Sequence, residues 1–267
     1  MVAGRPVAGE PVAGGPVGSH RAKVAAGPPG GRARLPAVAN PVLLLHGFTG
    51  SVESTWRPTG LMDLLSESGR RVIAWDLPGH GTAEKHHDPD AYDGMEAALV
   101  DRLADEAGDD AVVDGVGFSM GARTLLAMAA IAPQRFGRLV VAGVGRNLFE
   151  HDEEHAERIA AAVAGDADDS DVHAQTFARY AAEPGQDGRA LAAFMRRRHH
   201  PLGAEQFAAV THPVKVVLGT DDFAGPADPL LEALPDATLV ELKRCDHFAT
   251  PKNFGFIDAV MEHLEIA

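Results

Sequence analysis

The chain has 267 residues, of which 45% are hydrophobic and 23% charged, a balance typical of a globular protein with one large domain or two small ones. The formal net charge of −14 argues against nucleic acid and anionic membrane surfaces as partners, and no apolar run approaches the ~20 residues that cross a bilayer. Cys245 is the only cysteine, so neither an internal disulfide nor a cysteine-based metal cluster can form, and we expect a cytoplasmic protein.

Residues 1–39 differ in composition from the rest of the chain. They begin with a Val-Ala-Gly-x-Pro repeat and remain rich in glycine and proline, with little apolar side chain to bury. Such a segment cannot offset the entropy of ordering, so we predict a disordered leader, or an upstream stretch read from a misplaced start codon. A tether or binding arm is the alternative interpretation.

From residue 42 onward, strand-like and helix-like segments alternate. Short apolar runs typical of strands buried on both faces are found at 41–47, 70–76, 111–117, 138–144, 214–220 and 237–242. Segments with helical character are found at 57–69, 93–108, 119–133, 228–235 and 253–267. The alternation predicts an α/β protein with a mostly parallel central sheet, helices on both faces and right-handed crossovers.

Residues 147–212 interrupt this alternation with helix-like segments joined by turns rich in glycine, proline and aspartate. We predict a helical cap insert there, between the two parts of a core at 40–146 and 213–267. Ligands of open parallel sheets bind beyond the carboxyl ends of the strands. The chemically suggestive residues 46–48, Ser119 and 221–222 all fall at those ends, so the insert would cover the site.

Ser119 stands in the sequence Gly117-Phe-Ser-Met-Gly121, between a predicted strand and a predicted helix. This is the pattern of a nucleophile elbow, a turn so sharp that side chains two residues before and after the serine would collide with the crossing helix or strand. The two glycines remove those side chains. The turn would expose the Ser119 hydroxyl near free N–H groups at the helix start, among them that of Met120.

A serine hydroxyl needs a base to remove its proton and a third group to orient that base. His247 lies after the last predicted strand, where such a base is expected, and Asp221 and Asp222 follow the preceding strand. The order serine, acid, histidine along the chain is that of α/β-hydrolases.

From about Val42 to the C-terminus the sequence resembles the α/β-hydrolases, through the segments "LLLHGFTGS", "WDLPGHG", "GFSMGA", "LGTDDFAGP" and "CDHF". The resemblance implies a catalytic triad of Ser119, Asp222 and His247, with Asp221 as the less well placed acid. It also implies an oxyanion hole formed by the N–H groups of Phe48 and Met120.

The resemblance extends to the surroundings of this triad. It places His46 and Gly47 among the candidate substrate-binding residues, and it implies that His46 acts through the shape of its loop rather than as a base. We expect Phe48 and Trp56 to wall the pocket. Family members usually carry extra strands before the first strand found here, so we expect the sheet to be shortened or irregular at that edge.

The leading hypothesis is a serine-dependent hydrolase of small-molecule carboxylic esters, with thioesters, lactones and C–C bonds left open, and with no metal or organic cofactor. "HGFTGS", "DLPGHG" and "SMGAR" are also similar to the SHCHC synthases of menaquinone biosynthesis, which eliminate pyruvate and in which an arginine at the place of Arg123 helps to hold a substrate carboxylate. A third hypothesis is a small-molecule receptor that keeps the hydrolase shell. The sequence leaves a monomer or a dimer open.

Two further patterns have competing interpretations. His151 and His155 have the His-x-x-Glu-His spacing of some zinc proteases, but the segment also reads as a charged helix face, and we expect no metal site. The three arginines at 196–198 are typical of a solvated helix end, and they could instead receive an anionic substrate group if the insert folds over the site.

Overall fold

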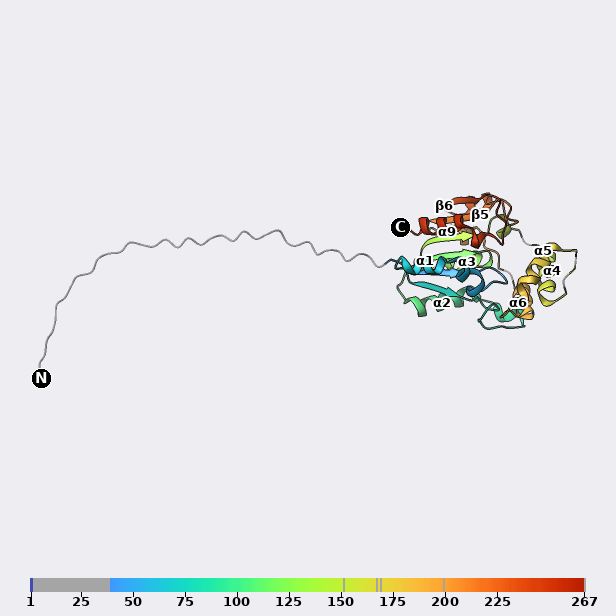
Figure 1. Cartoon of the computed structure of the whole chain (residues 1–267), viewed down its shortest axis with the longest axis horizontal. Coiled ribbons are helices and arrows are strands. Elements are labelled where there is room, and N and C mark those ends of the chain that lie inside the picture. The colour runs from blue at the N-terminus through green and yellow to red at the C-terminus, as the bar shows by residue number, and fades with distance from the viewer. Residues whose placement is uncertain (2–38, 151, 167, 169, 199, 267) are drawn as a thin grey trace. The chain divides into compact units, whose positions relative to one another are not determined.

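The structure is a computed structural model of the chain that describes Met1 and residues 39–150, 152–166, 168, 170–198 and 200–266 (Figure 1). The predicted leader at 1–39 lies almost entirely outside the described residues, as does His151. The elements of the fold belong to a unit that spans Val38–Ala267.

The described residues form a six-stranded sheet in which every pair of neighbouring strands is parallel. The strands are β1 (Val42–Leu45), β2 (Val72–Trp75), β3 (Val113–Phe118), β4 (Phe136–Ala142), β5 (Val214–Gly219) and β6 (Ala237–Leu242). Their order across the sheet is β2-β1-β3-β4-β5-β6. This confirms the predicted α/β fold, and within the described residues β2 and β6 are the two edge strands.

Helices follow most of the strands. The α-helices are α1 (Leu61–Glu67), α2 (Met95–Ala107), α3 (Met120–Ile131), α4 (Glu153–Ala164), α5 (Val172–Ala181), α6 (Gly188–Arg196), α7 (Ala204–Ala209), α8 (Asp228–Ala233) and α9 (Phe254–His263). A short π-type helix spans Val52–Trp56, and 3-10 turns span Arg57–Thr59, Pro89–Tyr92, Pro133–Arg135, Arg146–Leu148 and Thr250–Lys252. None of the helices in these described parts of the chain is long and apolar enough to cross a lipid bilayer.

The alternation of side chains along each strand divides the core into two layers. On β1, Leu43 and Leu45 pack on the face covered by α2 and α3, whereas Val42 and Leu44 pack on the face covered by α1 and α9. Strands covered on both faces need apolar side chains at every position, which is why they appear in the sequence as continuous apolar runs.

Two helix boundaries differ from the sequence-based expectation. The predicted helix at 57–69 is divided at Gly60, whose φ of 74° ends the 3-10 turn before α1 begins. An aspartate followed by a proline is typical of an N-cap residue and a first helical position, which predicts Asp228 as the N-cap of α8. The helix α8 instead begins at Asp228, and Ala227 is its N-cap residue. In both places the expected helix exists, and local backbone geometry moves its first residue.

Helices α4, α5 and α6 lie between β4 and β5 in the sequence and group together at one end of the unit (Figure 1). They share an apolar cluster that includes Ile159, Phe177 and Leu191. Their first turns are capped by Asp152, Asp171 and Asp187, whose carboxylates accept backbone N–H groups.

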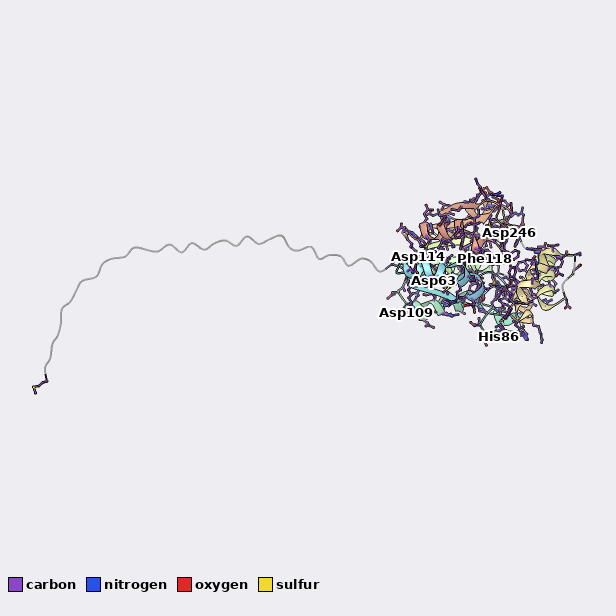
Figure 2. All side chains as sticks on the ribbon, viewed as in Figure 1. Asp63, His86, Asp109, Asp114, Phe118 and Asp246 are labelled. Atoms are coloured by element: carbon purple, nitrogen blue, oxygen red, sulfur yellow. The ribbon has the colours of Figure 1, made fainter. Side chains whose placement is uncertain are left out.

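The strands point toward these cap helices. Figure 2 shows Asp114, near the start of β3, on the side away from α4, α5 and α6, with Phe118 at the end of β3 nearer to them. Residues that follow the strands are therefore presented beneath the cap. By contrast, Phe207 of α7 packs into the cluster that contains α2 and α3.

Candidate active site

Ser119 connects β3 to α3 in a strained backbone conformation. Its φ of 53° and ψ of −116° are rarely adopted by a residue with a side chain. The N–H of Ser119 donates to the carbonyl of Ala142 on the neighbouring strand at 2.7 Å, which holds the turn against the sheet. Strain of this kind persists only where the surrounding structure enforces it, and it is typical of functional sites.

The two glycines around Ser119 are required by close packing. A Cβ atom on Gly117 would lie 2.6 Å from the Cα of Ala122 in α3, and one on Gly121 would lie 2.2 Å from the carbonyl oxygen of Leu45 in β1. Real Cβ atoms essentially never approach backbone atoms so closely. Any side chain at Gly117 would overlap the helix α3, and any side chain at Gly121 would overlap the strand β1, as the sequence pattern predicts.

The side chains of Ser119, His247 and Asp222 form a continuous chain of hydrogen bonds. The Nε2 atom of His247 lies 2.9 Å from the Ser119 Oγ, and the Nδ1 atom lies 2.9 and 3.0 Å from the two Asp222 carboxylate oxygens. The His247 side chain is 2% exposed and that of Asp222 is 0% exposed, so little water screens them. Because a carboxylate only accepts, Nδ1 carries the proton and Nε2 presents its lone pair to the hydroxyl.

Of the two adjacent acids, Asp222 contacts the imidazole. Its Oδ1 atom also accepts the N–H of Ala224 at 2.9 Å, which fixes the carboxylate. Asp221 is exposed, and its carboxylate accepts the Thr220 hydroxyl at 3.3 Å. A hydroxyl bonded to an imidazole whose other nitrogen contacts a buried carboxylate is the arrangement that activates a serine as a nucleophile.

The loop after β1 turns back on itself beside Ser119. The N–H of Gly50 donates to the carbonyl of Gly47 at 3.0 Å, and Thr49 has a positive φ of 60°. His46 fixes this turn, because its Nδ1–H donates to the Gly47 carbonyl at 2.8 Å while its Nε2 accepts the N–H of Leu77 at 3.0 Å. Burial lowers the pKa of His46, which keeps the ring neutral and able to accept that bond.

His46 and Gly47 do not reach the large cavity above Ser119. The His46 side chain is completely buried, and Gly47 borders a separate small cavity of about 90 Å³. A Cβ atom on Gly47 would lie 2.9 Å from the ring of Phe118, so the position needs a glycine for packing. Neither residue borders the large cavity, so the prediction that they are substrate-binding residues is corrected. Both residues instead determine the shape of the loop after β1.

The large cavity has a volume of about 970 Å³ and is bordered by Ser119, Phe48, Met120 and Arg123. Met120 is the first residue of α3, where backbone N–H groups have no partner within the helix. The Arg123 guanidinium donates to the carbonyl of His200 at 2.9 Å, and burial together with the charge of Arg197 lowers its pKa to about 10. The side chains predicted at 48, 119, 120 and 123 are therefore brought together.

Trp56 is elsewhere. The expectation that it walls the pocket is wrong, because its side chain is completely buried beneath the sheet and stacks on Phe256 of α9, with 6.3 Å between the ring centres. Trp56 is the last residue of the short helix at Val52–Trp56, and its indole packs in the core layer that contains α1 and α9. The cavity wall is formed by other aromatic residues.

Sequence reasoning missed the aromatic residues that surround the candidate base. The ring of Phe223 lies 4.3 Å from the ring of His247 and 4.3 Å from that of His173, both measured between centres. Phe177 and Phe194 of the cap border the same cavity. Phe223 directly follows Asp222, which is a local signal, but nothing in the sequence around the cap residues indicates which of them face the sheet.

The zinc-protease spacing leads to no metal site in the described residues, where no group of three ligating side chains is found. His151 lies outside these residues. His155 pairs with His173 of α5, whose Nδ1 atom lies 3.1 Å from the His155 Nε2. The two rings stack in parallel with 5.0 Å between their centres, so His155 packs across two cap helices.

The fold and the geometry of the site agree with comparison to known proteins. A family model described as the alpha/beta hydrolase fold matches residues 40–202. The chain therefore belongs to the alpha/beta hydrolase family, as the sequence motifs predict.

Individual relatives match parts of the chain. It is 32% identical to esterase YbfF of Escherichia coli (strain K12) over 120 residues, which are 43% of this chain and 43% of the relative. It is 38% identical to the dihydrolipoyllysine-residue acetyltransferase component of the acetoin cleaving system of Pseudomonas putida over 112 residues, 39% of this chain and 27% of the relative. The matched segments thus span less than half of these curated relatives.

Among solved structures, the chain is similar to that of a carboxylesterase from the ammonia-oxidizing thaumarchaeon Nitrososphaera gargenis. The TM-score is 0.64 and the sequence identity is 20%, over 85% of this chain and 90% of the other. At this identity the likeness shows the fold alone.

Proposed function

We propose that the protein is a serine-dependent hydrolase of small-molecule carboxylic esters. The observation that carries this proposal is the 2.9 Å contact between His247 Nε2 and Ser119 Oγ, with Asp222 bonded to the opposite nitrogen of the imidazole. Membership of the alpha/beta hydrolase family supports hydrolysis as the reaction, and the partial match to an esterase supports an ester as the substrate.

In the first half of the proposed reaction, the Ser119 oxygen attacks the carbonyl carbon while its proton passes to His247 Nε2. The carbonyl π electrons move onto oxygen, and the N–H groups of Phe48 and Met120 stabilise the negative charge. Asp222 keeps the Nδ1 proton in place and stabilises the imidazolium. When the carbonyl re-forms, the bond to the alcohol oxygen breaks and that oxygen takes the proton from His247.

In the second half, a water molecule attacks the acyl group on Ser119. His247 again takes one proton from the attacking oxygen and returns it to the Ser119 oxygen as the acyl bond breaks, which releases the carboxylic acid. The chain's own side chains and backbone N–H groups carry every step, so the proposed mechanism uses no cofactor. Thioesters and lactones would follow the same sequence of bonds.

The cavity of about 970 Å³ is at the upper end of the range of small-molecule sites, which supports a small-molecule substrate. The net charge of −14 supports the proposal that nucleic acid and anionic membranes are not partners. We also propose a cytoplasmic location, on the basis of the single cysteine.

The test combines covalent labelling with turnover. A fluorophosphonate probe should label Ser119, and Ser119→Ala should lower kcat on p-nitrophenyl acetate and butyrate by about four to six orders of magnitude. Ser66→Ala, at an exposed serine of α1 whose hydroxyl donates to the Met62 carbonyl, is the matched control and should retain labelling and turnover.

Unchanged turnover in Ser119→Ala would overturn the proposal. Ester turnover no faster than the uncatalysed rate, together with a rise in melting temperature on ligand binding, would favour the receptor hypothesis instead. Pyruvate release from the menaquinone-pathway intermediate, without ester hydrolysis, would favour the SHCHC synthase hypothesis.

A further inference from the structure

Arg197 is a cation of the cavity wall that has no acidic partner in the part of the chain that the structure describes. It directly follows α6 and borders the same cavity as Ser119. Among the described residues no carboxylate lies within 4.0 Å of its guanidinium, although the charge of Glu96 acts on it from farther away. Burying a cation without a close partner is costly, so proteins retain such a group where it has a function.

The guanidinium of Arg197 is held in place by its neighbours. It lies over the ring of Phe194 with 3.7 Å to the ring centre, and its Nη1 atom donates to the Phe194 carbonyl at 2.8 Å. Phe194 in turn stacks on Phe48, with 6.2 Å between ring centres. The fixed stacking leaves the other N–H groups of the planar fork available to a ligand, a geometry that matches carboxylates.

The adjacent arginine provides a contrast. Arg196 also borders the cavity, but it is exposed and its guanidinium bonds to both carboxylate oxygens of Glu157 on α4. Its charge is therefore already compensated within the cap. Two neighbouring arginines thus have different roles, one forming a link between cap helices and the other facing the cavity with its charge uncompensated.

A second guanidinium, that of Arg123, borders the same cavity, whose wall also includes the acidic residues Glu150, Asp152, Glu153 and Glu157. Arg123 lies one turn after Ser119 on α3, and its backbone N–H donates to the Ser119 carbonyl at 3.1 Å. Both side chains border the cavity, and the charge of Arg197 is among the causes that lower the pKa of Arg123. Burial lowers the pKa of Arg197 to about 10, so both remain protonated at neutral pH.

We infer that Arg197 binds a carboxylate carried by the substrate, so that the esters cleaved at Ser119 are anionic. This inference rests on the proposed ester hydrolysis for its reaction, but the binding of the anion is independent of Ser119. The carboxylate could belong to the acyl chain or to the alcohol, and the test separates the two.

The first measurement compares esters that differ only in charge. One set consists of p-nitrophenyl monoesters of adipic, pimelic and suberic acids, and its partners carry a terminal carboxamide in place of the carboxylate. A second set is formed by butyrate esters of 3-(4-hydroxyphenyl)propanoate and of its amide. In at least one set, the wild-type kcat/KM should favour the carboxylate by about 10- to 100-fold, the effect expected of charge-assisted hydrogen bonds.

Arg197→Gln should abolish this preference, so that kcat/KM for the carboxylate esters falls to about that for the matched amide esters. Arg197→Lys, which keeps the charge, should retain part of the preference. Arg196→Gln is the matched control and should retain all of it. Equal rates for carboxylate and amide esters in the wild type, or a preference that survives in Arg197→Gln, would overturn the inference.

A binding measurement keeps the two proposals separate. Calorimetry on Ser119→Ala should detect adipate or suberate binding that is weakened at least about 10-fold by the added Arg197→Gln. Arg197-dependent binding without any ester turnover would sustain the inference and overturn the proposed hydrolase. Turnover of neutral esters without a charge preference or dicarboxylate binding would do the opposite.

Discussion

The imidazole of His247 bridges Ser119 and Asp222, at 2.9 Å from each, although Ser119 is 128 residues away along the chain and Asp222 is 25. These contacts exist because Ser119, Asp222 and His247 follow β3, β5 and β6, whose carboxyl ends meet at one edge of the parallel sheet. The three loops thus bring together the side chains that the proposed ester hydrolysis requires.

Asp222→Asn should lower kcat on p-nitrophenyl butyrate by about 10⁴-fold with an unchanged fold, because an amide can hold the imidazole in the wrong tautomer and cannot stabilise its positive charge. Asp221→Asn is the matched control, since that side chain is exposed and bonds to Thr220. A larger loss in Asp221→Asn than in Asp222→Asn would assign the acid to the other residue.

Gly121→Ala should lower the free energy of unfolding by about 3 kcal/mol or more, because the new Cβ would overlap the Leu45 carbonyl oxygen of β1. Alanine normally favours a helix over glycine by about 1 kcal/mol, so a loss would be due to the clash alone. In Gly255→Ala of α9 the nearest atom is the flexible Leu242 Cδ2, at 3.0 Å, and urea unfolding should show a change within about 1 kcal/mol. Equal stabilities of the two variants would contradict the packing argument.

Replacing His80 should make stability less sensitive to acid. Burial lowers the pKa of His80 to about 3, so below the ordinary histidine pKa of about 6.5 the unfolded chain binds a proton that the folded chain refuses. Stability supported by the neutral ring is complete above that pH and is lost as the pH falls. Between pH 7.5 and 5.0 the loss amounts to about 2 kcal/mol.

The measurement is the free energy of unfolding of wild type and His80→Gln at both pH values. The variant should lose about 2 kcal/mol less than the wild type over this interval. Burial also lowers the pKa of His46, so the variant should keep a smaller acid sensitivity of the same sign. Identical losses in the two proteins would show that His80 takes up its proton in the folded state.

A buried ion pair at the opposite end of the strands should matter for stability and not for turnover. Arg70 donates to Asp114 at the start of β3 and to the Leu264 carbonyl after α9, and both charged side chains are 6% exposed. Asp114→Asn would leave the cation without its counter-charge, and urea unfolding should show a loss of about 3–5 kcal/mol.

The matched control is the exposed pair of Glu53 and Arg57, 2.8 Å apart, where Glu53→Gln should cost about 0.5 kcal/mol or less. Figure 2 shows Asp114 on the side of the unit away from the cap helices, so kcat of the folded Asp114→Asn protein should be unchanged. A fall in kcat without a fall in stability would place Asp114 in the active site.

The core strands could be predicted from the sequence because burial on both faces leaves a local signature. β1, buried at every position of Val42–Leu45, lies within the apolar run expected at 41–47, and the elbow around Ser119 requires its glycines for reasons visible within five residues. Whether Ser119, Asp222 and His247 carry out catalysis stays a prediction until the experiments above are done.

The features of the site that could not be predicted from the sequence depend on contacts between distant segments of the chain. Trp56 follows the first-strand loop and looks like a pocket residue, but the face that it buries is decided by Phe256 near the other end of the chain. Arg196 and Arg197 look alike in the sequence, and only the positions of Glu157 and Phe194 distinguish a compensated charge from an uncompensated one. No local pattern encodes such differences.

The cap helices leave the sheet after β4 and return at β5, and these two strands are neighbours. The segment between β4 and β5 is therefore connected to two adjacent strands of the sheet, and Ser119, Asp222 and His247 lie outside this segment. Within the described residues, the strand pairings of β4 and β5 involve no residue of α4, α5 or α6. If the proposed hydrolysis is correct, we expect substrate preference to change through the cap helices while Ser119, Asp222 and His247 stay in place.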